Sequence, residues 1–329
     1  MTFTPTRLPW DCCDGRPIAA GILSLAILSL SCCFFETASS VKTFGAQSDD
    51  GAPASTRTPA PAPTPLSKSA PGRSTHAQGP SLQRVVKSKI ALVEDANTSE
   101  ELLVKDADRV VPIASITKLM TAIVVLDAKP PMEEMLKVSD DDRDRVMGTT
   151  SRLRVGWALS REDMLHLALM ASENRAAAAL SRYYPGGRPA FIKAMNAKAA
   201  ELGMTKTHFV NPNGLTPENV STAHDLVKLV RAADEYELIR KFTTDPRYDV
   251  RIGRYVLPFG NPNRLVGRPD WDIDVQKTGF INDAGHCLVM RVNADGRSLI
   301  LIFLDAYGKL TRFADARRVV MQLALADKR

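Results

Sequence analysis

Residues 112–128 read Pro-Ile-Ala-Ser-Ile-Thr-Lys-Leu-Met-Thr-Ala-Ile-Val-Val-Leu-Asp-Ala. The part from Leu119 to Ala128 is too apolar for a surface helix, so the stretch predicts a buried helix. Ser115 and Lys118 lie where the chain enters this helix, at a spacing that puts both side chains on one face. Backbone N–H groups at a helix N-terminus have no intrahelical partner and favour negative charge. A hydroxyl beside an amine at that place is a candidate acylation nucleophile.

The same pattern also has an ordinary explanation, in which Ser115 caps the helix and Lys118 extends into solvent. A second Ser-x-x-Lys pattern, at residues 39–42, lies outside any predicted helix. The pattern alone is therefore weak, and its meaning depends on companion motifs elsewhere in the chain.

Composition indicates a globular protein and narrows its partners. The chain has 329 residues, of which 44% are hydrophobic and 24% charged. The net charge of +6 favours anionic polymers or lipid head groups as partners. The sequence has no run of Lys and Arg and no nucleic-acid-reading motif, which argues against nucleic acid as a partner.

The cysteines and histidines give no sign of a metal site. Four of the five cysteines fall within residues 12–33, and Cys287 lies in an apolar stretch that is typical of a core. The five histidines form no His-Glu-x-x-His motif or clustered ligand set. We therefore expect neither a metal nor a cofactor.

The N-terminal part has the composition of a targeting segment and a tether. Residues 18–35 are apolar and are followed by Ala-Ser-Ser at 38–40, which predicts a signal peptide over residues 1–40 and export to the periplasm. A retained membrane anchor, and hence membrane association, remains the alternative. Residues 41–87 are rich in Pro, Ala, Ser and Thr, and we expect a disordered linker. The folded domain is then predicted over residues 88–329.

Five stretches read as strands: residues 89–94, 102–105, 273–281, 286–293 and 297–306. The last three are separated by Asp-Ala-Gly at 283–285 and Ala-Asp-Gly at 294–296, which are hairpin turns. Consecutive hairpins make the sheet antiparallel. Strands at both ends of the domain with helices between them predict an α+β fold with one sheet built from the two ends.

Two further motifs accompany the first one. Lys277-Thr278-Gly279 lies on the first of the three C-terminal strands, and Ser172-x-Asn174 lies between two predicted helices. Each alone could be an ordinary edge strand or interhelix loop. Together, Ser-x-x-Lys, Ser-x-Asn and Lys-Thr-Gly in this order are the signature of penicillin-binding proteins and serine β-lactamases.

Beyond these motifs, the chain closely resembles the penicillin-binding protein 7 group, the D-alanyl-D-alanine endopeptidases. The resemblance extends from about residue 88 to the C-terminus and is carried by residues 109–126, 168–180, 183–204 and 276–290. It implies a five-stranded antiparallel sheet with helices on both faces, as in β-lactamases and DD-peptidases. It also implies hydrolysis of D-alanyl–diaminopimelate cross-bridges in peptidoglycan and covalent inhibition by β-lactam antibiotics.

The resemblance also assigns roles to residues. Ser115 is implied as the nucleophile, Lys118 as its base and Ser172 as the proton relay to the leaving amine. The implied substrate-binding residues are Asn174, Lys277, Thr278, Gly279 and Phe280. The backbone N–H groups of Ser115 and Phe280 are implied as the oxyanion hole. A lysine base must be neutral for part of the time, and we expect burial and the charge of Lys277 to lower the pKa of Lys118.

Three alternatives remain beside an endopeptidase. A class A β-lactamase uses a glutamate to hydrolyse its acyl-enzyme, but residues 211–217 contain no acid before Glu218, so we expect penicillin to trap Ser115. Related carboxypeptidases often carry a further β-domain and an amphipathic anchor, and the end of this chain at residue 329 favours an endopeptidase. A non-catalytic penicillin sensor or scaffold would not need Lys118 and Ser172.

Overall fold

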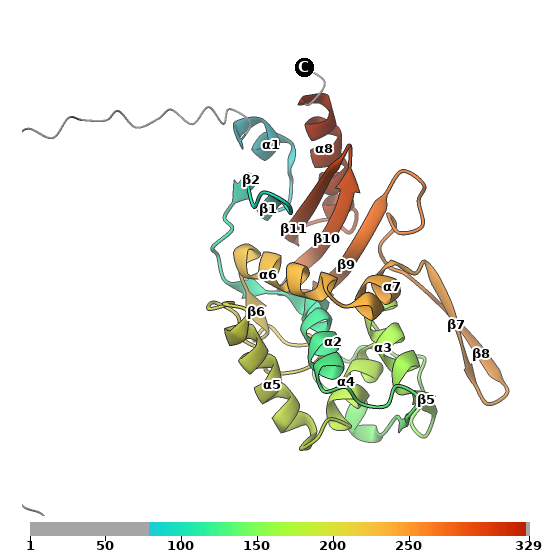
Figure 1. Cartoon of the computed structure of the whole chain (residues 1–329). Coiled ribbons are helices and arrows are strands. Elements are labelled where there is room, and N and C mark those ends of the chain that lie inside the picture. The colour runs from blue at the N-terminus through green and yellow to red at the C-terminus, as the bar shows by residue number, and fades with distance from the viewer. Residues whose placement is uncertain (1–78, 327–329) are drawn as a thin grey trace, which may run out of the picture. The chain divides into compact units, whose positions relative to one another are not determined.

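The computed structural model describes residues 79–326 (Figure 1). The predicted signal peptide, most of the predicted linker and the Ser-x-x-Lys pattern at 39–42 lie outside the described residues. The description below concerns the folded unit that carries the three motifs.

A five-stranded antiparallel sheet has the strand order β2-β1-β11-β10-β9. Its strands are β1 (Ile90–Asp95), β2 (Glu101–Lys105), β9 (Asp272–Ile281), β10 (Gly285–Ala294) and β11 (Arg297–Ala306). The two N-terminal strands and the three C-terminal strands thus join into one sheet, and both predicted hairpins are present. Strand β9, which carries Lys-Thr-Gly, lies at one edge of this sheet.

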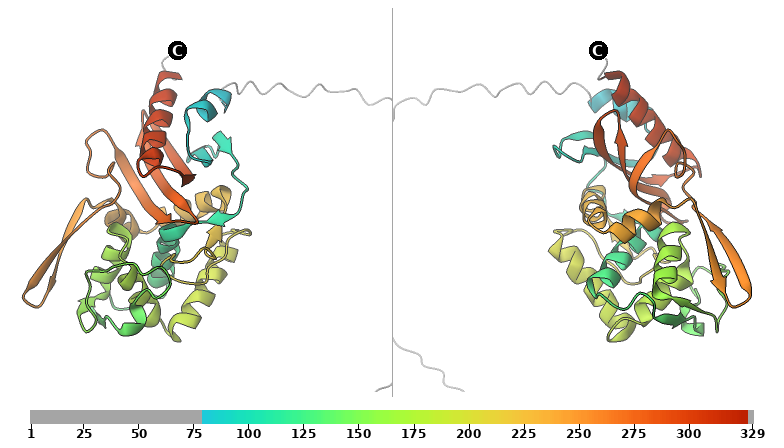
Figure 2. Two further views of the ribbon diagram at one scale, coloured as in Figure 1. Left: turned by 180° about the vertical axis from the view of Figure 1, so that it is seen from behind. Right: turned by 45° about the vertical axis from the view of Figure 1, so that its right-hand side comes forward.

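The central strand β11 is buried on both of its faces. Ile300, Ile302 and Leu304 belong to one apolar core, whereas Leu301 and Phe303 belong to the other. This division follows from the alternation of side chains along a strand. Helices therefore cover both faces of the sheet, as the views in Figure 2 show, and the predicted α+β class is confirmed.

Helices α1 and α8 cover one face of the five-stranded sheet. Helices α6 and α7 cover the other face, and α2 to α5 pack together on the same side. Their bounds are α1 (Gly79–Val85), α2 (Thr117–Asp127), α3 (Arg161–Met170), α4 (Asn174–Arg182), α5 (Gly187–Glu201), α6 (Ala223–Asp234), α7 (Glu237–Thr244) and α8 (Thr311–Ala326). Short elements complete the fold: β3 (Val111–Pro112), η1 (Ala114–Ile116), β4 (Met135–Lys137), η2 (Asp140–Asp142), β5 (Ala158–Ser160), β6 (Val220–Ser221), β7 (Arg247–Ile252) and β8 (Tyr255–Gly260).

Helix α2 is the buried helix that the sequence predicts. Every side chain from residue 117 to residue 125 is buried, including those of Leu119 and Ile123. Burying a side chain of this size contributes about 1.5–3 kcal/mol relative to leaving it in water. The helix is thus anchored in the core, and its first turn holds Lys118 in a fixed place.

The folded part begins before residue 88. Leu82 in α1 and the following Val86 are 1% and 3% exposed, and they belong to the same core as Phe313 of α8. The prediction of a linker that extends to residue 87 is therefore wrong at its C-terminal end. The two apolar side chains are four residues apart, so they lie on one side of the segment and pack together against the domain.

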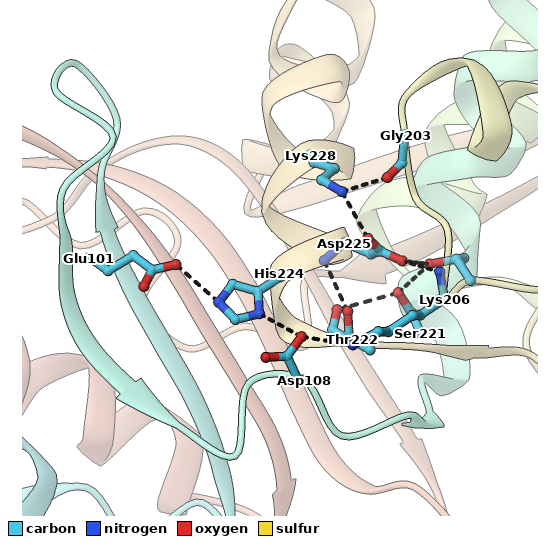
Figure 3. Close-up of polar contacts among 10 residues, drawn as sticks. Glu101, Asp108, Gly203, Lys206, Ser221, Thr222, His224, Asp225 and Lys228 are labelled. Atoms are coloured by element: carbon cyan, nitrogen blue, oxygen red, sulfur yellow. Dashed lines mark hydrogen bonds and ion pairs between the residues drawn. The ribbon is translucent and has the colours of Figure 1, made fainter. Parts of the chain in front are cut away.

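A polar network fixes the N-terminus of α6 and the segment that leads towards the first motif (Figure 3). The Thr222 hydroxyl accepts from the backbone N–H of Asp225 at 3.1 Å, which makes Thr222 the N-cap of α6. The ring nitrogens of His224 lie 3.0 Å from a Glu101 carboxylate oxygen and 3.3 Å from one of Asp108. These contacts hold α6 against strand β2 and the loop after it. The chain then continues into β3 and the short turn η1, which carries Ser115.

Two observations concern expectations about membranes and thiols. Among the described residues, no helix combines the length and the apolar character needed to cross a bilayer. Cys287 is fully buried in β10, and burial raises the pKa of its thiol to about 11. A thiol that ionises so poorly is a core group, as predicted, and not a nucleophile.

Candidate active site

Ser115 lies in the short 3₁₀ turn η1, immediately before α2. Ala114 has a φ of +48°, a left-handed conformation that is uncommon for a residue with a Cβ. The Thr117 hydroxyl donates to the Ala114 carbonyl at 2.8 Å and accepts from the Asn219 amide at 3.0 Å. The turn that presents Ser115 is therefore held in a strained conformation by hydrogen bonds from its own helix and from a distant loop.

Lys118 lies in the first turn of α2 and is fully buried. Its Nζ atom lies 2.8 Å from Ser115 Oγ, 2.8 Å from Asn174 Oδ1 and 2.7 Å from the Asn213 carbonyl oxygen. The last two atoms can only accept hydrogen bonds, and a neutral amine has two N–H donors and one lone pair. When the amine is neutral, its lone pair therefore faces the Ser115 hydroxyl.

The electrostatic surroundings favour that neutral amine. Burial lowers the pKa of Lys118 well below its usual value, and the nearby charge of Lys277 lowers it further. Glu173 acts in the opposite direction and is the smaller influence. Both predicted causes, burial and Lys277, thus act on the pKa of Lys118 in the predicted direction.

The Asn213 carbonyl is a part of the site that no sequence motif indicated. It belongs to the loop at residues 211–214, whose Pro212 carbonyl accepts from the Thr121 hydroxyl at 2.6 Å. Gly214 has a φ of +80°, and a Cβ there would lie 2.0 Å from the Ala114 carbonyl oxygen. This loop therefore packs its backbone directly on the nucleophile turn, which only glycine allows at that point.

The Ser-x-Asn motif spans the turn from α3 to α4. Ser172 has a φ of +59°, and no described residue makes a hydrogen bond to its hydroxyl. Asn174, the first residue of α4, donates through Nδ2 to the Thr149 hydroxyl at 3.1 Å while its Oδ1 accepts from Lys118. Asn174 therefore orients the amine, whereas the Ser172 hydroxyl is available to a substrate.

The Lys-Thr-Gly motif brings edge strand β9 against the nucleophile turn. Gly279 lies so close that a Cβ would be 3.0 Å from the Ile113 carbonyl oxygen and 3.2 Å from the Ser115 nitrogen. Lys277 is 1% exposed, and its Nζ donates to the Thr278 carbonyl at 3.0 Å. Burial, with a smaller influence of Arg312, lowers the pKa of Lys277 to about 7.

A cleft of about 300 Å³ separates the helix motifs from the strand motif. It is lined by Ser115, Thr149, Ala171, Ser172, Asn174, Leu215, Pro262, Thr278, Gly279, Phe280, His286, Lys309 and Arg312. The cleft thus brings together parts of all three motifs, which lie up to 164 positions apart in the chain (Ser115 to Gly279).

Seven cleft residues were not predicted from the sequence, and three of them have basic or ring side chains: His286, Lys309 and Arg312. Arg312 is 5% exposed, and its buried Nε has no hydrogen-bond partner among the described residues. His286 stacks on Phe280 at 4.3 Å, and its buried Nδ1 also has no such partner. His286 reaches the cleft at the start of β10, opposite Phe280, and Arg312 reaches it from the first turn of α8. No catalytic motif in the sequence includes either residue.

The fold and the cleft define a class of enzyme. A serine hydroxyl faces a buried, readily neutralised lysine at the foot of a core helix, beside a sheet edge that can hold an extended peptide. These are the features of a serine peptidase that uses lysine in place of histidine as its base.

Comparison with known proteins identifies the family. A family model described as D-alanyl-D-alanine carboxypeptidase, Peptidase S11, matches residues 75–308. The chain is 52% identical over 240 residues to a D-alanyl-D-alanine endopeptidase of Pseudomonas aeruginosa, a match that covers 72% of this chain and 77% of that protein. It is 51% identical to the Escherichia coli D-alanyl-D-alanine endopeptidase with the same coverage. This chain belongs to the Peptidase S11 family and is a serine peptidase.

Solved structures agree with this assignment. The Streptomyces K15 DD-transpeptidase has a TM-score of 0.67 and 26% identity, over 73% of this chain and 98% of that chain. Penicillin-binding protein D2 of Listeria monocytogenes, in a cefotaxime-bound form, has a TM-score of 0.64 and 30% identity, over 73% of this chain and 98% of that chain.

Proposed function

We propose that this protein is a serine DD-endopeptidase, which hydrolyses D-alanyl–diaminopimelate cross-bridges in peptidoglycan through an acyl-serine intermediate and is trapped by β-lactam antibiotics. The single observation that carries the proposal is the hydrogen-bond arrangement of Lys118. Its two donors are taken by Asn174 and Asn213, which directs its lone pair at Ser115. The relatives named above are D-alanyl-D-alanine endopeptidases, and they support this choice of bond.

The geometry supports a simple acylation step. Ser115 Oγ attacks the carbonyl carbon of a D-alanyl residue while its proton passes to Lys118 Nζ at 2.8 Å. The backbone N–H groups of Ser115 and Phe280 stabilise the oxyanion, and one such donor is worth roughly 10²–10³ in rate. A peptide aligned along edge strand β9 places its carbonyl between these groups.

The leaving amine then takes up a proton, and Ser172 is the residue that supplies it. Its hydroxyl lines the cleft beside Ser115 and receives no hydrogen bond from a described residue. It can pass a proton from the Lys118 ammonium to the amine nitrogen as the peptide C–N bond breaks. Water then hydrolyses the acyl-serine ester, with Lys118 again accepting the proton.

Defined muropeptides test the proposal. The purified protein is incubated with a D-alanyl–diaminopimelate cross-linked dimer and, separately, with an uncross-linked pentapeptide monomer, and the products are separated by chromatography. We expect the dimer to be converted into two monomers and the Ser115→Ala variant to be inactive. Ser181→Ala removes a buried hydroxyl in α4 that donates to the Ala178 carbonyl, and it serves as the matched control.

Each result points to one activity. Release of D-alanine from the pentapeptide without cleavage of the dimer would establish a carboxypeptidase, the activity that the family description prints. Labelling of Ser115 by penicillin without cleavage of either substrate would establish a sensor or scaffold. Fast hydrolysis of penicillin would contradict the expected slow deacylation.

We further propose that residues 1–40 direct export and that the enzyme acts in the periplasm. The support is the apolar stretch at residues 18–35 and the location of the proposed substrate outside the inner membrane. N-terminal sequencing of the protein recovered from a periplasmic fraction tests this proposal. Recovery with residues 1–40 intact in the membrane fraction would favour the retained anchor.

A further inference from the structure

The hairpin β7–β8 extends away from the five-stranded sheet (Figures 1 and 2). One of its faces, which includes Tyr248, Val250 and Phe259, packs against the helical part of the domain. The opposite face carries Arg247, Arg251 and Val256, all exposed. Tyr255 and Phe259 lie four residues apart on β8 and, by the alternation of the strand, share the packed face. The arginines that stack on these two rings therefore lie along the side of the hairpin that meets the helical part of the domain.

Three arginines at this hairpin are held by aromatic rings rather than by carboxylates. The guanidinium carbon of Arg152 lies 3.8 Å from the ring centre of Phe259. The guanidinium carbons of Arg154 and Arg254 lie 5.3 Å and 5.2 Å from the rings of Trp157 and Tyr255 respectively. We call Arg152, Arg154 and Arg254 the arginine surface.

Two of the rings are also stacked on each other. Trp157 and Tyr255 lie 5.7 Å apart at an interplanar angle of 26°, so Arg154, the two rings and Arg254 form one continuous stack between the loop and the hairpin. Such stacking fixes the guanidinium planes and leaves their charge unneutralised. Arg254 also donates through Nη2 to the Tyr255 hydroxyl at 3.1 Å, and its other N–H donors make no hydrogen bond to a described residue. Among the described residues, no Asp or Glu lies within ion-pair distance of these three side chains.

The arginine surface approaches the cleft through Arg152. A hollow lined by Thr150, Arg152, Ala171 and Phe259 adjoins it, since Ala171 borders both and Thr150 follows the cleft residue Thr149. One acid, Glu173, also lines this hollow. It is 9% exposed, and its carboxylate accepts from the backbone N–H of Arg175. The charge that reaches solvent at this end of the cleft is therefore mainly positive.

We propose that the arginine surface binds the carboxylates of peptidoglycan stem peptides and so holds the polymer while one cross-bridge occupies the cleft. This inference rests on the proposed function, and it names a second contact region for the same substrate. Peptide stems carry several carboxylates, and planar guanidinium groups fixed by stacking are well suited to bind them. A small substrate that fills only the cleft does not reach this surface.

The test compares two triple variants of equal charge change. One is Arg152→Gln, Arg154→Gln and Arg254→Gln. The control is Arg84→Gln, Arg109→Gln and Lys193→Gln. It removes three exposed basic groups that make no ion pair with another described residue and lie on α1, on the loop before β3 and on α5. Both are measured for sedimentation with purified peptidoglycan sacculi at low and high salt, and for acylation by a fluorescent penicillin.

We expect the arginine-surface variant to bind sacculi roughly tenfold more weakly than the control at low salt, with the difference shrinking at high salt. Acylation by penicillin should remain within about twofold of the unaltered protein. Arg→Lys at the same three positions keeps the charge but loses the planar, stacked guanidinium group, so it should restore part of the low-salt binding and not all of it. Cleavage of sacculi should fall more than cleavage of an isolated dimer.

Several results would overturn the proposal. One is equal binding by the two triple variants. Another is a loss of binding that Arg→Lys does not restore, which would indicate a role of the stack in folding. A third is a variant that binds sacculi normally but loses binding to vesicles containing phosphatidylglycerol, which would assign the surface to a membrane. Failure of the unaltered protein to be acylated by penicillin would instead contradict the proposed function and leave sacculus binding to be judged separately.

Discussion

The two sides of the cleft are built differently. On the helix side, Lys118 makes contacts at 2.7–2.8 Å to Ser115, Asn174 and Asn213, so its hydrogen-bonding capacity is satisfied within the protein. On the strand side, the buried Arg312 Nε and His286 Nδ1 have no hydrogen-bond partner among the described residues. A buried polar group without a partner costs roughly 1–3 kcal/mol. The polar groups of the helix side are therefore paired within the protein, whereas the strand side leaves two polar atoms that a substrate can pair.

The largest expected effect comes from the base on the helix side. Lys118→Met removes the only amine within hydrogen-bonding distance of Ser115 Oγ among the described residues. We expect acylation by penicillin to slow by roughly 10³-fold, because a general base typically contributes 10²–10⁴-fold. Stopped-flow measurement of acylation checks this. Lys193→Met, at an exposed position in α5, is the control. A loss of less than about tenfold would remove Lys118 from the mechanism.

The second prediction tests how the strand side acts on the helix side. Lys277→Met removes the neighbouring cation that lowers the pKa of Lys118, so that pKa should rise. The base is active when neutral, so the acylation–pH profile should move to higher pH. The rate below about pH 7, where Lys277 is charged, should fall roughly 10–100-fold.

Lys309→Met is the control for this shift, because it removes an exposed cation from the same cleft whose charge water screens. A profile for Lys277→Met that keeps its midpoint and only loses amplitude would show that Lys277 acts on the substrate and not on Lys118.

The third prediction concerns the arginine that completes the strand side. Arg312→Gln should raise KM roughly 10–100-fold for a peptide with a free carboxylate beside the scissile bond, since a hydrogen bond to a charged group is worth about 1.5–3 kcal/mol. The amide of the same peptide should be unaffected by the substitution. Arg317→Gln changes an exposed arginine on the same helix and is the control. An equal rise in KM for both peptides would indicate that Arg312 stabilises the fold and does not bind the carboxylate.

The smallest effect separates a backbone role from a side-chain role on strand β9. Phe280→Leu keeps the proposed oxyanion N–H and should change the acylation rate less than about threefold. Gly279→Ala, one position earlier, adds a Cβ 3.2 Å from the Ser115 nitrogen and should slow acylation at least about tenfold. A larger loss for Phe280→Leu than for Gly279→Ala would mean that the Phe280 ring itself, stacked on His286, binds the substrate.

Much of this architecture follows from local sequence signals. The two hairpin turns around β10 and the unbroken apolar run of α2 have few alternative structures, so the sheet and the buried helix could be predicted. Ser115, Lys118, Ser172 and Asn174 could be proposed as site residues from the sequence, because the Ser-x-x-Lys and Ser-x-Asn motifs are short continuous stretches. The predicted linker boundary was wrong because the apolar side chains that bury Leu82 and Val86 come partly from α8, which is far away in the sequence.

The sequence by itself determined which groups are available for the chemistry: a serine and a lysine one helical turn apart, a Ser-x-Asn loop and a Lys-Thr-Gly strand. Only the tertiary structure decided how these groups behave. Burial and the charge of Lys277 lower the pKa of Lys118. The hydrogen bond to the Asn213 carbonyl helps to direct the amine lone pair towards Ser115. His286 joins the cleft through the pairing of β10 with β9, and Arg312 joins it from the first turn of α8. Charge, burial and hydrogen bonding act through space, and the distances that set them come from packing rather than from spacing along the chain.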